Sequence, residues 1–599
     1  MKPLFHIKDP YNSKRLYKLT NVNREEVLIE MKEAEMYSLQ NFRERVGSMG
    51  NFRWKSGPAE LNALGDFLYD NTETAEEIKQ LGWNKAGFFV WGNGIFNEGK
   101  FVAVDDYGIC RLDKYNEEGQ LAGTVNYYLP AMSKIYSDRK DMFKFERLFS
   151  NRENHSSVTL PNYCKMMADV FGTNAKVGVM FLFATLFRDI VVSFTKNFPI
   201  LNLFGPKGSG KSELGHTLMS FFIADNTPLN IQNATIAALA DAIAQCSNAL
   251  VHIDEYKNCI DPVKIEFLKG LYDGTGRSRM NMDLDKKREI TSVDSAVILS
   301  GQEMPTVDVA LFSRTIYLTF SQTVHDRDAK VKFNELTAIR KMGVSHLTNE
   351  ILSHRTEFEN AFHDAYKLVC DDLSLGIQGN EVEDRIWRDW AVLLTSYKCL
   401  LSCMSLPWSY EEMKNITIEG IRLQNQECAS SNEMGNFWDI FQYMSQSGMI
   451  YDEGDYKIKY LDAISTNILD NRLFNKKTAV LLIRPKRIIL QFKKAAKMTD
   501  SKAMNERSIR FYLQTSPGYL GKKKGSERFK VIIDGEVQKQ YACGENGGSR
   551  ELVQFDNPLC FDYELLKSKF DLNLETSLSS GDSEDEDLNE GALPFPPAQ

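Results

Sequence analysis

The sequence lacks the features that mark secreted, zinc-stabilised and membrane proteins. Its ten cysteines include no Cys-x-x-Cys pair, and no Cys/His cluster has the spacing of a zinc site. Residues 1–12 are polar and contain two prolines, unlike a signal peptide. Free thiols in a reducing compartment are the better account of the cysteines, so we expect a cytoplasmic protein.

No long uninterrupted apolar run is present either. The most apolar stretch, Val177–Phe194, contains the adjacent charges Arg188 and Asp189. A membrane span would hold that pair at its centre only at a high cost in free energy. We therefore expect a buried helix here and no membrane partner.

The composition is that of an ordinary globular protein. Its 599 residues are 43% apolar and 26% charged, and the formal net charge is −9. At about 150 residues per domain, this length predicts three to five domains. The net charge alone says little about partners, because the charges are spread unevenly along the chain.

The clearest motif follows a short apolar run. Residues 200–204 predict a buried strand, and residues 205–212 after it match Gly-x-x-x-x-Gly-Lys-Ser in full. The glycines let successive backbone N–H groups point at a phosphate, and the helix that begins at Lys211 adds its partial positive charge. We predict an ATP site in which Lys211 contacts the β- and γ-phosphates and Ser212 ligates Mg²⁺. The whole loop is Gly205, Pro206, Lys207, Gly208, Ser209, Gly210, Lys211 and Ser212.

A second apolar run, residues 249–253, ends in two acids, Asp254 and Glu255. Asp254 is placed to hold Mg²⁺ together with Ser212, and Glu255 is placed to polarise the attacking water. Acids at a strand end are common, so the pair is a specific signal only because a phosphate loop precedes it.

Two further polar residues are candidates for the same site. Gln302 follows the apolar run 296–300 and is placed to orient the attacking water or contact the γ-phosphate; the alternative is a solvated turn residue. Arg314 precedes another strand-like run. It is a candidate arginine finger for a neighbouring subunit, with a structural salt bridge as the alternative.

A glycine-rich basic hairpin is predicted at residues 270–288. Such a loop can project into the pore of a ring and grip the phosphates of DNA, and a solvated loop is the alternative. Its basic residues are Arg277, Arg279, Lys286, Lys287 and Arg288.

The first 140 residues predict a small α+β domain. Residues 21–48 have a charged helical pattern, whereas residues 82–130 predict strands with a Gly-Asn-Gly turn at 92–94. The aromatic residues here form either a core or a platform that stacks nucleic-acid bases. They are Trp83, Phe88, Phe89 and Trp91.

A primase site in this domain would need paired carboxylates that hold two metal ions. Asp105 and Asp106 are adjacent, so on a strand they would face opposite ways. The sequence therefore gives a primase little support.

The C-terminal third contrasts with the rest in charge. Residues 472–530 contain 17 Lys or Arg and three acids, a local net charge of +14. A helical pattern at 508–514 and an expected basic hairpin at 521–530 predict a winged-helix-like module that binds DNA phosphates through Lys522, Lys523 and Lys524. Residues 581–590 carry six acids and no Lys or Arg, which predicts a disordered tail that solubilises the chain or docks a replication partner.

These patterns divide the chain into six parts. They are an N-terminal α+β domain (1–140), a helical segment (141–195), an α/β P-loop ATPase domain (196–330), a helical domain (331–450), a winged-helix-like domain (451–575) and an acidic tail (576–599).

The order of the motifs resembles that of the superfamily 3 helicases of the AAA+ class, in particular the helicase modules of phage, plasmid and integrative-element primase–helicases. The resemblance covers roughly residues 150–330, and it implies a hexameric ring that couples ATP hydrolysis to movement along single-stranded DNA. The family usually has Asn where this sequence has Gln302. A longer primase or zinc-binding portion also often precedes its helicase.

We therefore expect an ATP- and Mg²⁺-dependent DNA helicase or translocase, acting on single-stranded or forked DNA in the replication of a phage or mobile element. One alternative is an ATP-switched initiator or defence ATPase that binds DNA without unwinding it. The other is a primase–helicase with an unrecognised N-terminal active site.

Overall fold

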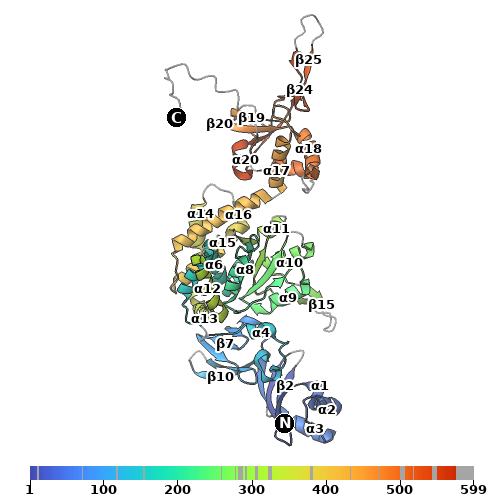
Figure 1. The fold of residues 1–599 in the computed structure, drawn as a ribbon, viewed down its shortest axis with the longest axis vertical. Coiled ribbons are helices and arrows are strands. Elements are labelled where there is room, and N and C mark those ends of the chain that lie inside the picture. Colours follow the sequence, from blue (N-terminus) through green and yellow to red (C-terminus); the bar gives the residue numbers. More distant parts are fainter. Residues whose placement is uncertain are drawn as a thin grey trace. The chain divides into compact units, whose positions relative to one another are not determined.

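The chain forms two compact units, Met1–Gln424 and Asn425–Gln599 (Figure 1). The computed structural model describes residues 1–9, 13–70, 72–115, 119–152, 156–257, 260–276, 278–280, 288–290, 293–303, 308–321, 327–377, 382–431, 433–469, 471–498, 506–516, 518–541 and 549–574. The predicted acidic tail lies outside these residues.

The first unit begins with a six-stranded sheet in the order β3-β2-β1-β4-β10-β9. Its strands are β1 (Lys2–Lys8), β2 (Lys14–Thr20), β3 (Glu26–Lys32), β4 (Glu73–Glu77), β9 (Ile109–Tyr115) and β10 (Leu121–Tyr128). Three helices lie between β3 and β4: α1 (Glu33–Tyr37), α2 (Leu39–Gly47) and α3 (Pro58–Asp70).

The helical expectation for residues 21–48 is wrong in its first half. Ile29 and Met31 flank the less buried Glu30, and β3 buries these two residues in a core with Tyr17 and Leu19. Alternation with period two is a strand pattern, and the charged residues between the apolar ones made it look helical.

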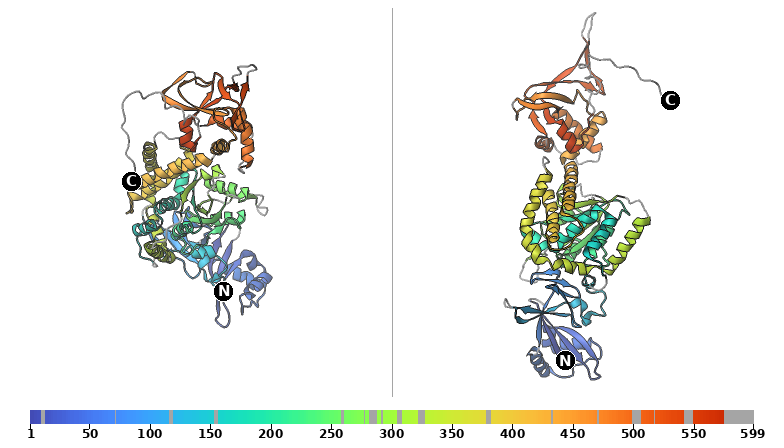
Figure 2. Two further views of the ribbon diagram at one scale, coloured as in Figure 1. Left: turned by 45° about the horizontal axis from the view of Figure 1, so that its top comes forward. Right: turned by 90° about the vertical axis from the view of Figure 1, so that its left-hand side faces the viewer.

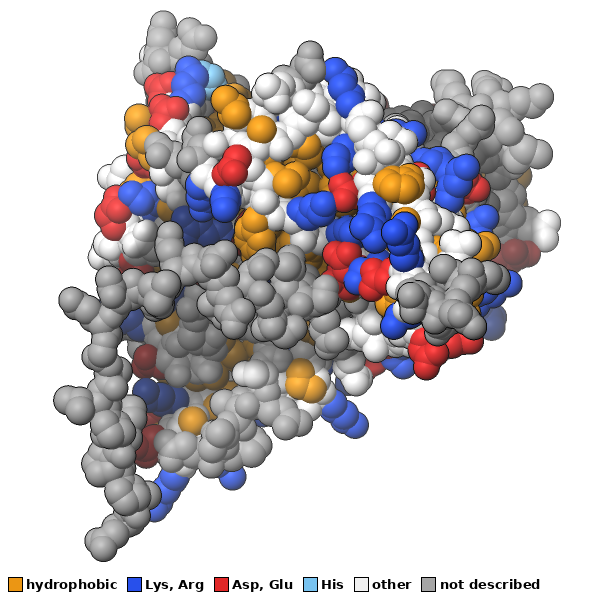
Figure 3. Space-filling model, turned by 90° about the horizontal axis from the view of Figure 1, so that it is seen from above, with side chains coloured by type: hydrophobic (Ala, Val, Ile, Leu, Met, Phe, Trp, Pro, Cys, Tyr) orange, Lys and Arg blue, Asp and Glu red, His pale blue; other side chains and the backbone are white. Residues whose placement is uncertain are grey.

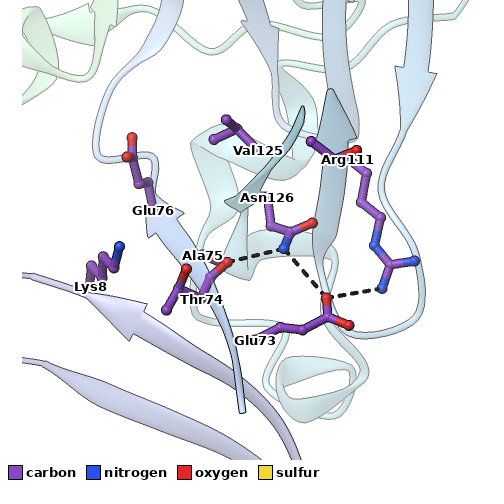
Figure 4. Close-up of a pocket in the computed structure, with 9 residues that line it drawn as sticks. Lys8, Glu73, Thr74, Ala75, Glu76, Arg111, Val125 and Asn126 are labelled. Carbon is purple, nitrogen blue, oxygen red and sulfur yellow. Dashed lines mark hydrogen bonds and ion pairs between the residues drawn. The ribbon is translucent and has the colours of Figure 1, made fainter. Parts of the chain in front are cut away.

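Strands β4 and β10 pair only where they end, at Glu76–Tyr127 and Glu77–Tyr128. Before that point they separate around a polar pocket of about 600 Å³ (Figure 4). Asn126 bridges the opening, because its Nδ2 donates to the Thr74 carbonyl at 3.0 Å.

A second sheet has the order β13-β5-β6-β7-β8. It contains β5 (Leu81–Asn84), β6 (Phe88–Trp91), β7 (Gly94–Asn97), β8 (Lys100–Ala103) and the distant β13 (Cys246–Ser247). Phe88, Phe89 and Trp91 are buried, and Arg355 lies over the ring of Trp83 at 3.6 Å. Phe88, Phe89 and Trp91 are therefore core residues, and the half-buried Trp83 has a ring face covered by Arg355, so the four do not form an open platform for bases.

Asp105 and Asp106 lie in the turn between β8 and β9. The Asp105 carboxylate accepts the N–H groups of Tyr107 and Ile109, and Asp106 pairs with Lys134. Across the described ranges, no group of three or more His, Cys, Asp or Glu side chains is placed to hold a metal ion.

A five-stranded parallel sheet forms the middle of the first unit, in the order β12-β14-β17-β11-β18. The strands are β11 (Ile200–Phe204), β12 (Leu229–Asn230), β14 (Leu250–Tyr256), β17 (Ala296–Gly301) and β18 (Thr315–Thr319). The inner strands are buried apolar runs, as a parallel sheet covered on both faces requires. Helices α8 (Lys211–Met219), α9 (Ile236–Ala244), α10 (Pro262–Tyr272) and α11 (Val309–Phe312) connect them (Figure 2).

The apolar stretch Val177–Phe194 forms two helices and not the single helix expected. α6 (Thr173–Leu186) and α7 (Arg188–Thr195) meet at a bend of 83° beside Phe187, whose backbone leaves the helical region. No single described helix is long and apolar enough to cross a membrane, although this bent pair passes that test by length and composition. Arg355 pairs with Asp189, so the carboxylate at the bend has a partner of opposite charge.

The remaining helices of the first unit precede or follow the parallel sheet. They are α4 (Lys144–Leu148), α5 (Leu160–Phe171), α12 (Arg327–Met342), α13 (Ser345–Leu352), α14 (Arg355–Gly376), α15 (Asp384–Leu401) and α16 (Tyr410–Ser431), which crosses the division between the units.

The second unit has a sheet in the order β19-β20-β28-β21. Its elements are α17 (Glu433–Gln446), β19 (Tyr456–Ile464), β20 (Arg472–Ile483), α18 (Pro485–Met498), α19 (Glu506–Thr515), β21 (Tyr519–Lys522), β28 (Leu559–Asp562) and α20 (Tyr563–Phe570). Phe437 and Trp438 of α17 share a core with Phe492 and Phe561. The structure therefore draws the boundary at 424–425, where the sequence suggested 450.

The expected hairpin at 521–530 is wrong, because β21 and β22 (Glu527–Lys530) do not pair with each other. β21 pairs with β28, and β22 pairs with β27 (Val553–Asp556). Leu520 of β21 packs with Val480 and Cys560, so apolar contacts direct the strand to the central sheet. The chain between β22 and β27 includes β23 (Ile532–Ile533), β24 (Glu536–Val537), β25 (Lys539–Tyr541) and β26 (Ser549–Glu551).

Candidate nucleotide-binding site

Three neighbouring strands of the parallel sheet end at the same level. Phe204 of β11 and Tyr256 of β14 both lie opposite Gly301 of β17. Ligands of open α/β sheets bind at the carboxyl ends of the strands. The predicted phosphate loop, the two acids and Gln302 therefore emerge at one edge of the sheet.

The phosphate loop has the backbone that its glycines predict. Gly208 and Gly210 have φ values of 79° and 90°, and α8 begins at Lys211. The Lys211 side chain is buried, and its Nζ donates to the Pro206 carbonyl at 3.3 Å across the loop. The buried Ser209 hydroxyl has no hydrogen-bond partner among the described residues. A glycine turn at positive φ and an unpartnered buried hydroxyl, at a helix N-terminus, fit a phosphate group.

The two acids lie on a bulge in β14. The register between β14 and β17 shifts between Ile253 and Tyr256, and Glu255 has a φ of 64°, in the left-handed region. A bulge redirects side chains, and left-handed backbone at a residue other than glycine is strained. Both features turn Asp254 and Glu255 out of the strand at its carboxyl end.

A line of buried hydrogen bonds fixes the Asp254 carboxylate. Ser300 Oγ donates to Asp254 Oδ1 at 2.5 Å, and His252 Nε2 lies 2.8 Å from Ser300 Oγ. Since the hydroxyl proton is directed to the carboxylate, His252 Nε2–H is the donor to Ser300. The Glu255 N–H also donates to Oδ1, which leaves Oδ2 without a contact in the described part of the chain. That oxygen is the one available to a metal ion.

Gln302 follows β17 directly, between the phosphate loop strand and the acidic strand, and its side chain is exposed. Its place agrees with either predicted role, a contact to the γ-phosphate or a solvated turn.

Arg314 makes contacts within its own chain. Its Nη1 donates to the Ala310 carbonyl at 2.7 Å, its Nη2 lies 3.6 Å from Asp273, and the guanidinium lies over the ring of Tyr272. The side chain is 13% exposed. An arginine finger would have to exchange these contacts for a neighbour's phosphate.

A cavity of about 780 Å³ opens beside the phosphate loop at Gly208–Gly210. Apolar rings line it together with two amides: Phe171, Phe320, Phe333, Asn174 and Asn334. Asn174 Nδ2 donates to the Thr319 carbonyl at 2.8 Å, so this amide has a fixed orientation. The cavity joins a partly aromatic lining to the predicted phosphate loop, an arrangement that suits a nucleoside with attached phosphates.

Arg340 is a charged neighbour of the loop that the sequence did not reveal. Its Nη1 lies 2.5 Å from Glu213 Oε2, one residue after Ser212. This ion pair ties α12 to the first turn of α8.

The predicted DNA contacts are described only in part. β15 (Ser278–Met280) pairs with β16 (Arg288–Ile290), so the basic hairpin is present and places Arg279 opposite Glu289. Arg277, Lys286 and Lys287 lie outside the described residues. In the second unit Lys523 pairs with Glu527, whereas Lys522 and Lys524 are exposed.

No protein-family model and no curated protein matches the sequence. A solved structure described as "SCCmec type IV Cch - active helicase" has 13% identity and a TM-score of 0.51, and the match covers 96% of this chain and 94% of that one. A putative ATPase from Cytophaga hutchinsonii (10% identity, 47% of this chain, 90% of that chain, TM-score 0.28) and the JCV helicase (15%, 46%, 69%, 0.22) are too distant to support an argument. The chain thus has the fold of a solved helicase, built on a P-loop α/β core.

The buried His252 gives a prediction about acid stability. Burial lowers its pKa to about 4 from the ordinary 6.5. The stability that this neutral ring supports is complete above pH 6.5. It is lost as the pH falls toward 4, at up to about 1.4 kcal/mol per pH unit, because the unfolded chain takes up the proton first.

In denaturant titrations of the full chain at neutral and mildly acidic pH, His252→Gln is expected to lose less stability on acidification than wild type. The exposed histidine variant His363→Gln is the control and should keep the wild-type slope. Identical slopes for all three proteins would contradict the prediction.

Proposed function

We propose that the chain is a Mg²⁺-dependent ATPase of the AAA+ class that drives a DNA helicase in the replication of a phage or mobile element. One observation supports it most: the phosphate loop, the acidic bulge and Gln302 meet at the carboxyl ends of three adjacent parallel strands. A phosphate cradle beside a free carboxylate oxygen is what nucleotide hydrolysis needs.

Each residue has a place in this proposal. Lys211 and the loop N–H groups bind the phosphates, and Ser212 and Asp254 Oδ2 would hold Mg²⁺. The metal ion, when bound, neutralises charge on the phosphates. Glu255 orients the attacking water and accepts its proton, and Gln302 contacts the γ-phosphate. Phe171 and Phe333 enclose the base in the adjacent cavity, which favours ATP over a bare polyphosphate.

The helicase part of the proposal rests on other observations. The solved structure that shares this fold is described as an active helicase. The β15–β16 hairpin follows α10 and presents a basic sequence, as a DNA-gripping pore loop would. The second unit has the succession helix, two strands, two helices, strand and long hairpin, which we assign to a winged-helix-like module. A hexameric ring would bring Arg314 to a neighbour's ATP.

Lys211→Ala is expected to abolish ATP turnover, because the loop loses the cation that contacts the phosphates. Wild type should hydrolyse ATP, and faster with single-stranded DNA present. A wild-type rate no higher than that of Lys211→Ala would refute the ATPase.

Strand displacement from a forked duplex then separates the helicase from its rivals. ATP hydrolysis with DNA binding and no displacement would favour an initiator or defence ATPase. Primer synthesis from ribonucleotides would favour a primase–helicase.

Ser300→Ala should raise the Mg²⁺ concentration for half-maximal hydrolysis by about 10- to 100-fold, the usual effect of losing a group that orients a metal ligand. The cause would be an Asp254 carboxylate that keeps only the hydrogen bond from the Glu255 N–H and is held less firmly. Ser300→Thr retains the hydroxyl and should remain close to wild type. Equal Mg²⁺ requirements in the alanine variant and wild type would show that the hydrogen bond does not position Asp254.

Arg314 can be tested by mixing two inactive proteins, Lys211→Ala and Arg314→Ala. In a ring, the intact loop of one protein meets the intact arginine of the other, so the mixture should recover part of the wild-type ATP turnover. Continued inactivity of the mixture, with mixed rings verified by native mass spectrometry, would assign Arg314 to its contacts with Asp273 and Tyr272.

A further inference from the structure

Helix α18 of the second unit carries basic residues and no acid. Its sequence from Pro485 to Met498 contains Lys486, Arg487, Lys493, Lys494 and Lys497. The other face of the helix is buried: Ile488, Ile489, Phe492, Ala495 and Ala496 are all at most 4% exposed.

The exposed side chains of α18 form one stripe. Lys486, Leu490, Lys493, Lys494 and Lys497 are all exposed, and their spacing of three, four and seven residues places them on one helical face. At 1.5 Å per residue, Lys486 and Lys497 are about 16 Å apart along the axis. Lys and Arg side chains also gather beside exposed hydrophobic ones on the face drawn in Figure 3.

These lysines differ from several basic side chains of the same unit, which pair with acids. Arg487 pairs with Asp455 at 3.0 Å, Arg484 lies 3.4 Å from Asp556, and Arg510 pairs with Glu506. Within the described ranges, no acid pairs with Lys486, Lys493, Lys494 or Lys497. Their charges are therefore available to an external anion.

We propose that this lysine stripe is the main DNA-binding surface of the second unit and that it binds the phosphate backbone of duplex DNA. The inference rests on the proposed function and deepens it, because it names the surface and the form of the nucleic acid.

Two observations favour a duplex. A rigid row of positive charges about 16 Å long complements the regular phosphates of a stiff double helix. Single strands are usually held by aromatic rings that stack on bases, and the exposed face of α18 has none, because Phe492 is buried.

The helix is poorly suited to a membrane surface. Interfacial helices insert an apolar face among lipids, whereas the apolar face of α18 is part of the core of its own unit. Leu490 and Met498 alone remain exposed on the helix as large apolar side chains.

The test compares two matched double variants of the full chain, Lys493→Gln/Lys494→Gln in α18 and Lys476→Gln/Lys477→Gln in β20. Each removes two adjacent exposed lysines from the same unit, so the change in net charge is identical. Binding to a fluorescent duplex is measured by anisotropy over a range of salt concentrations, and thermal melting shows that both variants are folded.

The α18 variant is expected to bind about 30-fold more weakly near physiological salt, and its log–log salt slope should be smaller by about 2. Both values correspond to two lost phosphate contacts. The β20 variant should show only the small change in duplex affinity and salt slope that the loss of two positive charges causes at long range.

Equal losses in both variants would overturn the proposal, because they would reflect net charge alone. Duplex binding by wild type that neither variant weakens would also overturn it while leaving the proposed function in place. If the wild-type protein does not bind DNA, both the proposed lysine stripe and the proposed helicase function are refuted. Loss of binding to anionic phosphatidylserine vesicles, with duplex binding unchanged, would replace DNA by a membrane surface.

Discussion

Gly301 ends the strand that lies between the strand of the phosphate loop and the strand of the acidic bulge. A Cβ atom at this position would lie 2.5 Å from the Tyr256 carbonyl oxygen. On the other side, the Gly301 carbonyl accepts the Gly205 N–H at 3.4 Å. Backbone alone therefore sets the spacing between Lys211 and Asp254, and any side chain here would force the strands apart. The proposed nucleotide site, with its phosphate loop after β11 and its metal ligand in β14, depends on this spacing.

The line of hydrogen bonds from His252 through Ser300 to Asp254 costs free energy, because it buries polar groups. Its position below the bulge explains that cost. Burying His252 and Ser300 in the sheet is unfavourable unless they are hydrogen-bonded, and His252 Nδ1 has no partner among the described residues. A purely structural core would contain apolar residues at both positions. The line instead directs a hydroxyl at one oxygen of Asp254 and leaves the other oxygen free. This arrangement holds the Asp254 carboxylate in one orientation.

Local patterns located the main residues of the candidate site, whereas residues that depend on pairing between distant strands and helices were not found. The phosphate loop and the bulge acids were predictable because each is a short segment at a strand end. The role of Ser300 required knowing that β14 and β17 are neighbours, since His252 is 48 residues away. The ion pair between Arg340 and Glu213 was missed for the same reason, because the two residues are 127 positions apart in the sequence. The false hairpin at 521–530 has this cause too, because β21 pairs with β28 and β22 pairs with β27. A polar residue inside an otherwise apolar strand, as at His252, was the one available signal.

The second unit shows why a count of charges is a weak guide to a binding surface. Residues 472–530 have a net charge of +14, yet several of their basic side chains are neutralised by acids of the same unit. A neutralised lysine gains little from a phosphate, because it must first give up its partner. A lysine on a loop loses conformational entropy on binding, whereas the backbone of a packed helix is already ordered. Unpaired charge, exposure and a fixed backbone coincide on α18. The same criterion gives less weight to Lys523, although it stands in the most basic run of the sequence.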